Sequence, residues 1–169
     1  MYLWKIDNLI AELRNGTLSQ AARFKYLLAF MLITVIIMEI SIFVSEVPSV
    51  ASLSESIIVI LITVLGTIWC YQTNKSGDNQ EFIDRFICLT LPILVRIFVI
   101  FLLIFSLYMT IGFLLFGDSF DKFTEKTSWI DVGFTICFEF YYYWKLSNAI
   151  SLVANKRLEQ TPKTGAAQS

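Results

Sequence analysis

Three charged side chains, Glu39, Arg96 and Glu139, lie inside long apolar stretches of this sequence. A charge at the centre of a bilayer costs roughly 2.5–3.5 kcal/mol on insertion scales, so such a residue usually faces the interior of a helix bundle and finds a partner or lines a path. Arg96 and Glu139 each stand about ten residues, or ~15 Å, from the start of their stretch, which is near the middle of a ~30 Å hydrocarbon layer. We therefore predict an Arg96–Glu139 ion pair between antiparallel helices.

Two further features of these stretches carry polar groups. Glu39 stands about 13 residues, or ~20 Å, into its stretch, with no basic residue expected at that depth, so we expect it to be protonated because burial disfavours a charged carboxylate. Asp131, Thr135 and Glu139 recur every four residues and share one helix face. That stripe either lines a proton, ion or solute path or hydrogen-bonds neighbouring helices, and we expect the second.

Side-chain chemistry typical of soluble enzymes is missing from the sequence. There is no histidine, and the three cysteines Cys70, Cys88 and Cys137 form no C-x-x-C pair, which argues against zinc and dithiol sites. No phosphate-binding loop or nucleophile elbow occurs. We therefore expect no enzymatic activity, no cofactor and no metal. A net charge of −1 without a basic stripe also argues against a nucleic-acid partner.

The elements that must position these residues are long apolar segments. Of the 169 residues, 56% are hydrophobic and 16% charged, whereas soluble domains have about 45–50% and 25%. Spanning a bilayer takes about 20 residues, and lipid offers no water to unpaired backbone groups, so each segment should be a helix. We predict an all-α, polytopic membrane protein with a transmembrane domain over 25–153 and four spans at about 26–45, 53–71, 86–116 and 129–153. Small polar residues such as Thr63 and Thr67 predict close-packing faces.

The two ends of the chain have a different character. Residues 1–24 contain apolar positions at helical spacing, followed by Asn15-Gly16, which should end the helix, and Ser19, which could cap the next one. We predict a cytoplasmic amphipathic helix that either lies on the membrane surface with Trp4 among the headgroups or packs on the end of the bundle. Residues 154–169 should form a flexible cytoplasmic tail.

Basic residues set the expected orientation. Ten Lys and Arg residues lie in the N-terminal segment, the 72–85 loop and the C-terminal end, but only two lie in the other loops. Because cytoplasmic loops carry an excess of Lys and Arg, both termini should face the cytoplasm.

A resemblance to known proteins covers residues 74–96. The segments Asn74-Lys-Ser-Gly-Asp, Phe82-Ile-Asp-Arg-Phe and Leu91-Pro-x-x-x-Arg96 resemble part of small, uncharacterised bacterial four-span inner-membrane proteins. The resemblance implies a bacterial cytoplasmic membrane and supplies no activity. Small multidrug-resistance transporters share the four-span layout and a glutamate in the first span, but they are shorter and lack Arg96.

We therefore expect a membrane-embedded interaction or accessory subunit, whose partners are the lipid bilayer and either another membrane protein or a second copy of the chain. Two alternatives stay open. One is a small proton-coupled transporter or channel that uses the intramembrane carboxylates. The other is a protein similar to the immunity proteins against pore-forming bacteriocins, which have a comparable size and layout, although no motif is shared.

Overall fold

The described part of the chain is entirely helical. The computed structural model describes residues 2–43, 50–116 and 129–160, leaving out the side chains at 37–43, 115, 116, 131 and 156–160. Within these ranges there are five helices and no strand, which confirms the all-α prediction. The helices are α1 Ile6–Asn15, α2 Gln20–Phe43, α3 Val50–Ser76, α4 Phe82–Phe116 and α6 Trp129–Gln160.

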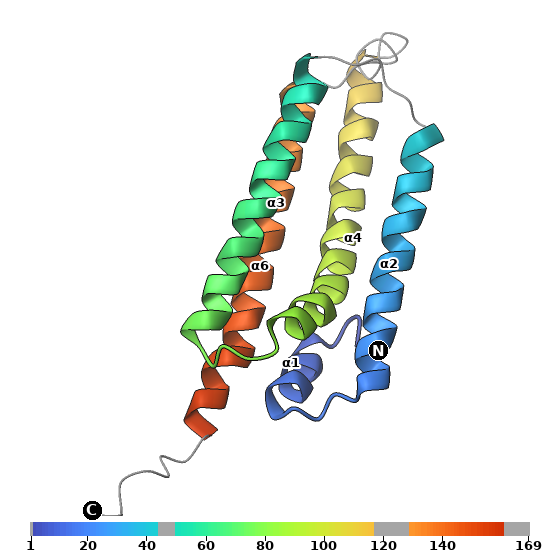
Figure 1. Cartoon of the computed structure of the whole chain (residues 1–169). Helices are drawn as coiled ribbons and strands as arrows, with labels where there is room; N and C mark the ends of the chain where they lie inside the picture. The colour runs from blue at the N-terminus through green and yellow to red at the C-terminus, as the bar shows by residue number, and fades with distance from the viewer. Residues whose placement is uncertain (1, 44–49, 117–128, 161–169) are drawn as a thin grey trace, which may run out of the picture.

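Four long helices run side by side with alternating direction, and the short α1 lies across their lower end (Figure 1). The most extensive contact joins α3 and α6, and α4 packs beside α6. Among the described residues, α2 contacts a single helix, α4, although α3 follows α2 in the chain. The bundle is therefore a tight α3–α6 pair, extended sideways by α4 and then by α2.

Two helices, α3 and the segment Phe82–Leu114 of α4, are long and apolar enough to cross a membrane. The core helix of a soluble protein would be mostly buried, but only 11% of the most apolar window of α3 and 39% of that of α4 are buried inside the protein. Large apolar side chains such as Leu65 and Leu103 point outward instead. These exposed faces suit a lipid environment.

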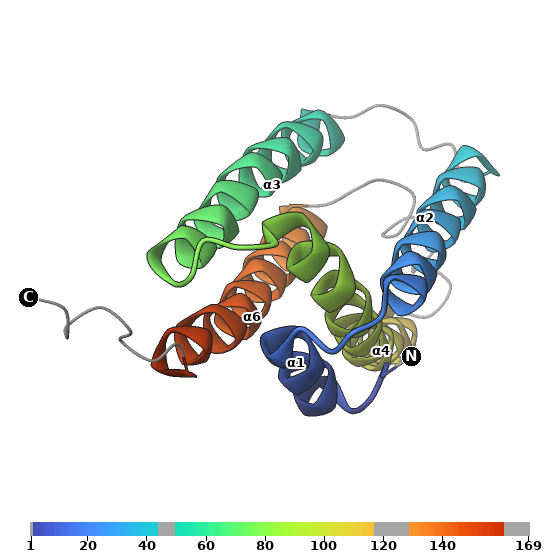
Figure 2. The same ribbon diagram turned by 60° about the horizontal axis from the view of Figure 1, so that its bottom comes forward.

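Helix α4 bends near its beginning. Pro92 lies inside this helix and is fully buried, and an internal proline removes one helical hydrogen bond and clashes with the preceding turn. Figures 1 and 2 show that the first turns of α4 cross the lower end of the bundle before the helix turns to follow the others. Distance along the sequence of α4 therefore overestimates depth along the bundle.

Helix α1 packs on the bundle rather than presenting its apolar face to lipid. It ends at Asn15, with Gly16 in the left-handed region (φ 67°), as the sequence predicted. Ser19 caps α2 by accepting a 3.3 Å hydrogen bond from the backbone N–H of Ala22. Leu9 and Leu13 are fully buried where α1 meets α4 and α6. Of the two interpretations of this helix, packing on the bundle end is the one that the contacts favour.

Candidate functional site

Polar side chains follow the interface between α3 and α6. The Thr135 hydroxyl donates a 2.6 Å hydrogen bond to the Glu55 carboxylate on α3. Glu139 lies one turn further along α6 and is partly buried, and no ion pair involves it among the described residues. Glu55 is a residue that the sequence analysis missed, because it stands only two residues inside the predicted second span.

The middle of the interface is closed by Tyr143. A Cβ atom at Gly66 would lie 2.3 Å from Cγ of the Tyr143 ring, so only glycine leaves room for it. The Tyr143 hydroxyl interacts with the hydroxyl groups of Thr63 and Thr67. These threonines therefore lie on a close-packing face, as predicted.

Further hydrogen bonds join the helices below Tyr143. Thr73 on α3 and Ser147 on α6 are joined at 2.8 Å, and the Tyr142 hydroxyl donates to Thr90 on α4 at 3.0 Å. Each of these hydroxyl groups forms a hydrogen bond with a hydroxyl group on a facing helix. These polar groups are therefore used to join helices, whereas the role of the Asp131, Thr135 and Glu139 stripe as a whole stays a prediction.

A buried ion pair organises the turn between α3 and α4. The Arg85 side chain is completely buried and donates to both carboxylate oxygens of Asp78, at 2.5 and 2.6 Å, and to Asn74 at 2.8 Å. Asn74 in turn donates to the Gln80 carbonyl at 3.2 Å. The charged and amide groups of the segment 74–85, which carried the sequence resemblance, thus have a structural role.

A second ion pair ties α2 to the start of α4. The Arg23 guanidinium contacts the carboxylate of Asp84 and lies 3.6 Å from that of Glu81. Burial alone would lower the pKa of Arg23, but the hydrogen bond to Asp84 and the charges of Glu81 and Asp84 outweigh burial and raise it. Arg23 therefore remains charged and paired.

Arg96 does not meet Glu139. Its guanidinium donates to the backbone carbonyl of Trp4, its Nε atom is buried without a hydrogen-bond partner, and no ion pair joins the two residues. The predicted pair is therefore wrong. Because α4 bends near Pro92, Arg96 lies beside the Tyr141–Leu152 part of α6 and close to α1, lower than its position in the sequence suggested.

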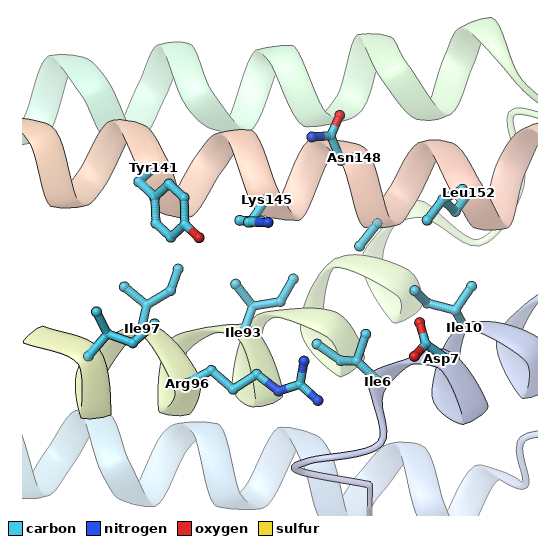
Figure 3. Close-up of a pocket in the computed structure, with 12 residues that line it drawn as sticks. Ile6, Asp7, Ile10, Ile93, Arg96, Ile97, Tyr141, Lys145, Asn148 and Leu152 are labelled. Atoms are coloured by element: carbon cyan, nitrogen blue, oxygen red, sulfur yellow. The ribbon is translucent and has the colours of Figure 1, made fainter.

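Arg96 instead borders a pocket of about 400 Å³ between α1, α4 and α6. One wall is apolar and comes from Ile93, Ile97 and Ile100 of α4. The facing wall is more polar and comes from α6, which contributes Tyr141, Lys145, Asn148, Ala149 and Leu152. Helix α1 closes one end of the pocket with Ile6, Asp7 and Ile10. Figure 3 shows Tyr141 and Lys145 opposite Ile93 and Ile97, and Arg96 on the other side of these isoleucines, extended toward Ile6 of α1.

Lys145 is held at this pocket by aromatic rings. Its Nζ atom lies 5.5 Å from the centre of the Tyr141 ring and 5.0 Å from that of Trp144, distances at which a cation is attracted to the ring face. A second, aromatic pocket of about 160 Å³ lies higher between α4 and α6, where Phe101, Phe105 and Phe134 are among its walls.

For the other predicted site residues, Glu39 and Asp131, the structure describes the backbone but not the side chain. Glu39 falls within α2 and Asp131 within α6, but both side chains lie outside the described residues. Among the side chains that are described, no group of three or more Cys, Asp or Glu residues is arranged to hold a metal ion.

Comparison of the chain with protein-family models, with curated protein sequences and with solved structures gives no match. The site must therefore be interpreted from its own geometry.

Proposed function

We propose that this chain is a four-span protein of a bacterial cytoplasmic membrane that acts as an interaction subunit, with helix α2 as the surface that binds another membrane protein. Both termini face the cytoplasm in this proposal. The distribution of Lys and Arg, ten against two, supports the orientation, and the resemblance over residues 74–96 supports the membrane. Four long helices of alternating direction fit the four spans.

Binding is favoured over transport by the way polar groups are used. Thr135 and Ser147 bond to groups on α3, Tyr142 bonds to Thr90 on α4, and the Tyr143 ring fills the space over Gly66. A solute path needs polar groups that face a water-filled space. Here Thr135, Tyr142 and Ser147 join helices instead.

The observation that carries the proposal is the isolation of α2. This helix contacts only α4 among the described helices, and its outward side is apolar. We define the α2 outer face by the exposed residues Phe24, Leu28, Met31, Leu32 and Val35. Positions 24, 28, 31 and 35 are spaced four, three and four apart, the spacing by which helices pack side by side in left-handed pairs. A transmembrane helix of the partner would supply the neighbour that α2 lacks.

Photo-crosslinking in intact cells tests this proposal. A photoreactive amino acid at Leu32 or Val35 should give one protein adduct of discrete mass in the membrane fraction. Leu103 and Leu107 of α4 are the matched controls, because both are large, apolar and exposed, and they should give none. An adduct of twice the chain mass would identify the partner as a second copy. Equal adducts from both helices, or none from α2, would overturn the proposal.

A proton-coupled transporter is the second candidate, and one observation favours it. Glu55 and Glu139 place two carboxyl groups on facing helices within one turn of Thr135. Purified protein in liposomes that contain a pH-sensitive dye separates the two functions. A transporter would show proton flux that Glu139→Gln abolishes, whereas the interaction subunit would show no flux before or after that change.

A further inference from the structure

We propose that the pocket between α1, α4 and α6 binds one anionic phospholipid, with its phosphate near Arg96 and Lys145 and an acyl chain along the isoleucines of α4. This lipid site is separate from the α2 outer face and goes beyond the proposed function. It rests on the same four spans and the same orientation.

The basic residues inside the predicted spans have no counter-charge in the described part of the chain. Arg96 and Lys145 are the two basic residues inside the four predicted spans. Neither has a carboxylate within ion-pair distance among the described residues, whereas Arg85 and Arg23 are both neutralised. These two cations of the predicted spans line the same pocket. Two positive charges held near a low-dielectric region attract an anion and are costly without one.

One acidic residue, Asp7, also lines the pocket, and its position reduces its effect. It stands in the first turn of α1, where the helix dipole favours negative charge. Counted with Arg96 and Lys145, it leaves the pocket lining with a net positive charge. The chemistry therefore fits a ligand with one negative charge.

Arg96 and Lys145 also bring an excess of hydrogen-bond donors to the pocket. The Nε atom of Arg96 is buried and unpartnered, and a guanidinium offers five N–H donors, of which the Trp4 carbonyl uses one. Lys145 offers three more from the facing helix. A phosphodiester supplies acceptor oxygens without donors, so it matches a site rich in donors.

The wall of the pocket that α4 contributes is apolar. Ile93, Ile97 and Ile100 are spaced four and three residues apart on one side of α4, so they form a continuous apolar strip. Ile93 and Ile97 are almost fully buried, whereas Ile100 is about half exposed, so the strip is open to the surrounding lipid at Ile100. A volume near 400 Å³ lies within the ~300–1,000 Å³ range of ligand pockets. A small soluble anion would leave this apolar wall unused, so the occupant is amphipathic.

The position of the pocket agrees with a lipid of the inner leaflet. In the proposed orientation α1 and the lower end of α6 lie on the cytoplasmic side, and Tyr141 and Trp144 have the character of an interfacial aromatic belt. Anionic lipids attract basic residues at that surface, and basic pockets between transmembrane helices bind their headgroups.

Native mass spectrometry of the purified full chain in detergent tests the site. With equal amounts of phosphatidylglycerol and phosphatidylcholine, one phosphatidylglycerol should bind preferentially. Lys145→Gln should weaken its binding about fivefold, from ~1 kcal/mol per basic residue, and Asp7→Asn should strengthen it. Lys75→Gln is the matched control, because Lys75 is exposed on the same side of the bundle and does not line the pocket.

Three results would overturn the lipid site. One is an unchanged preference in Lys145→Gln, and another is an equal loss in Lys75→Gln. The third is displacement of phosphatidylglycerol by millimolar inorganic phosphate, which would identify a soluble anion as the ligand. Lys145 makes no hydrogen bond to another described residue, so this variant should fold, and its elution profile and circular dichroism verify this. The crosslinking pattern of α2 is independent of these readouts, so either proposal can fail alone.

Discussion

The Tyr143 ring lies directly against Gly66, with its Cγ atom where a side chain at position 66 would begin. This contact sets how closely α3 and α6 approach. Gly66→Ala should therefore push the helices apart and lower the free energy of unfolding by about 1–3 kcal/mol, the usual cost of overpacking. Thermal unfolding in detergent measures the effect.

Gly133 provides the control for that substitution, because it is also helical and a Cβ atom there would meet nothing within 4 Å. Gly133→Ala should be neutral or slightly stabilising, since alanine has the higher helix propensity. Equal losses at positions 66 and 133 would mean that the Tyr143 contact does not limit the packing.

The Asp78–Arg85 pair should be essential for stability. Asp78→Asn leaves the guanidinium of Arg85 buried without its counter-charge, and breaking a buried pair in this way costs about 3–5 kcal/mol. Chemical denaturation followed by tryptophan fluorescence measures the loss. Asp84→Asn is the comparison, because its partner Arg23 is only partly buried and exposed pairs contribute roughly 0–1 kcal/mol. A larger loss of unfolding free energy in Asp84→Asn than in Asp78→Asn would contradict this account of the turn.

Exchanging the charges of Arg96 and Glu139 should not restore a damaged protein. Arg96 bonds to the Trp4 carbonyl rather than to Glu139, so Arg96→Glu combined with Glu139→Arg adds two defects instead of rebuilding one pair. Expression level and monodispersity of the double variant should be no better than those of the worse single variant. Recovery beyond both single variants would show that the two residues interact after all.

The two ends of α3 should be accessible from opposite sides of the membrane. In a background without Cys70, Cys88 and Cys137, a cysteine at Val50 should react with an impermeant thiol reagent added to intact spheroplasts. A cysteine at Lys75 should react only in inverted vesicles. Both positions are exposed at the helix ends, and the distribution of basic residues dictates the direction. The reverse pattern would show that the topology is opposite to the proposed one. Labelling of both positions from one side would show that α3 does not span the membrane.

Local features of the fold could be predicted because they depend on neighbours in the sequence. The stop at Gly16, the cap at Ser19 and the packing face with Thr63 and Thr67 all follow from residue type and helical spacing. Those threonines are four residues apart, so they lie on the same side of α3 in any surroundings. Their contact with Tyr143 of α6 depends on which helices pack together. Helical spacing within one segment does not determine which other helix will pack against it.

The position of Arg96 shows where prediction from sequence fails physically. Its depth was derived from a straight helix that begins at the membrane surface, but α4 bends near Pro92 and spends its first turns across the end of the bundle. The proline was visible in the sequence, whereas the direction and extent of the bend depend on packing against α1 and α6. The 400 Å³ pocket was unpredictable for the same reason, because three helices distant in sequence enclose it.

The contacts of α1 and α2 have a consequence for the order in which the fold is completed. Within this chain α2 is synthesised before α3, yet α4, the one helix that α2 contacts in the described part of the chain, follows α3. Helix α1 is made earlier still, and it packs on α4 and on α6, the last helix. During synthesis α2 therefore lacks its described helix neighbour until α4 has been made, and α1 gains its contacts to α6 only after that. A chain that stops before α6 would therefore leave α1 with its contacts to α4 but without those to α6.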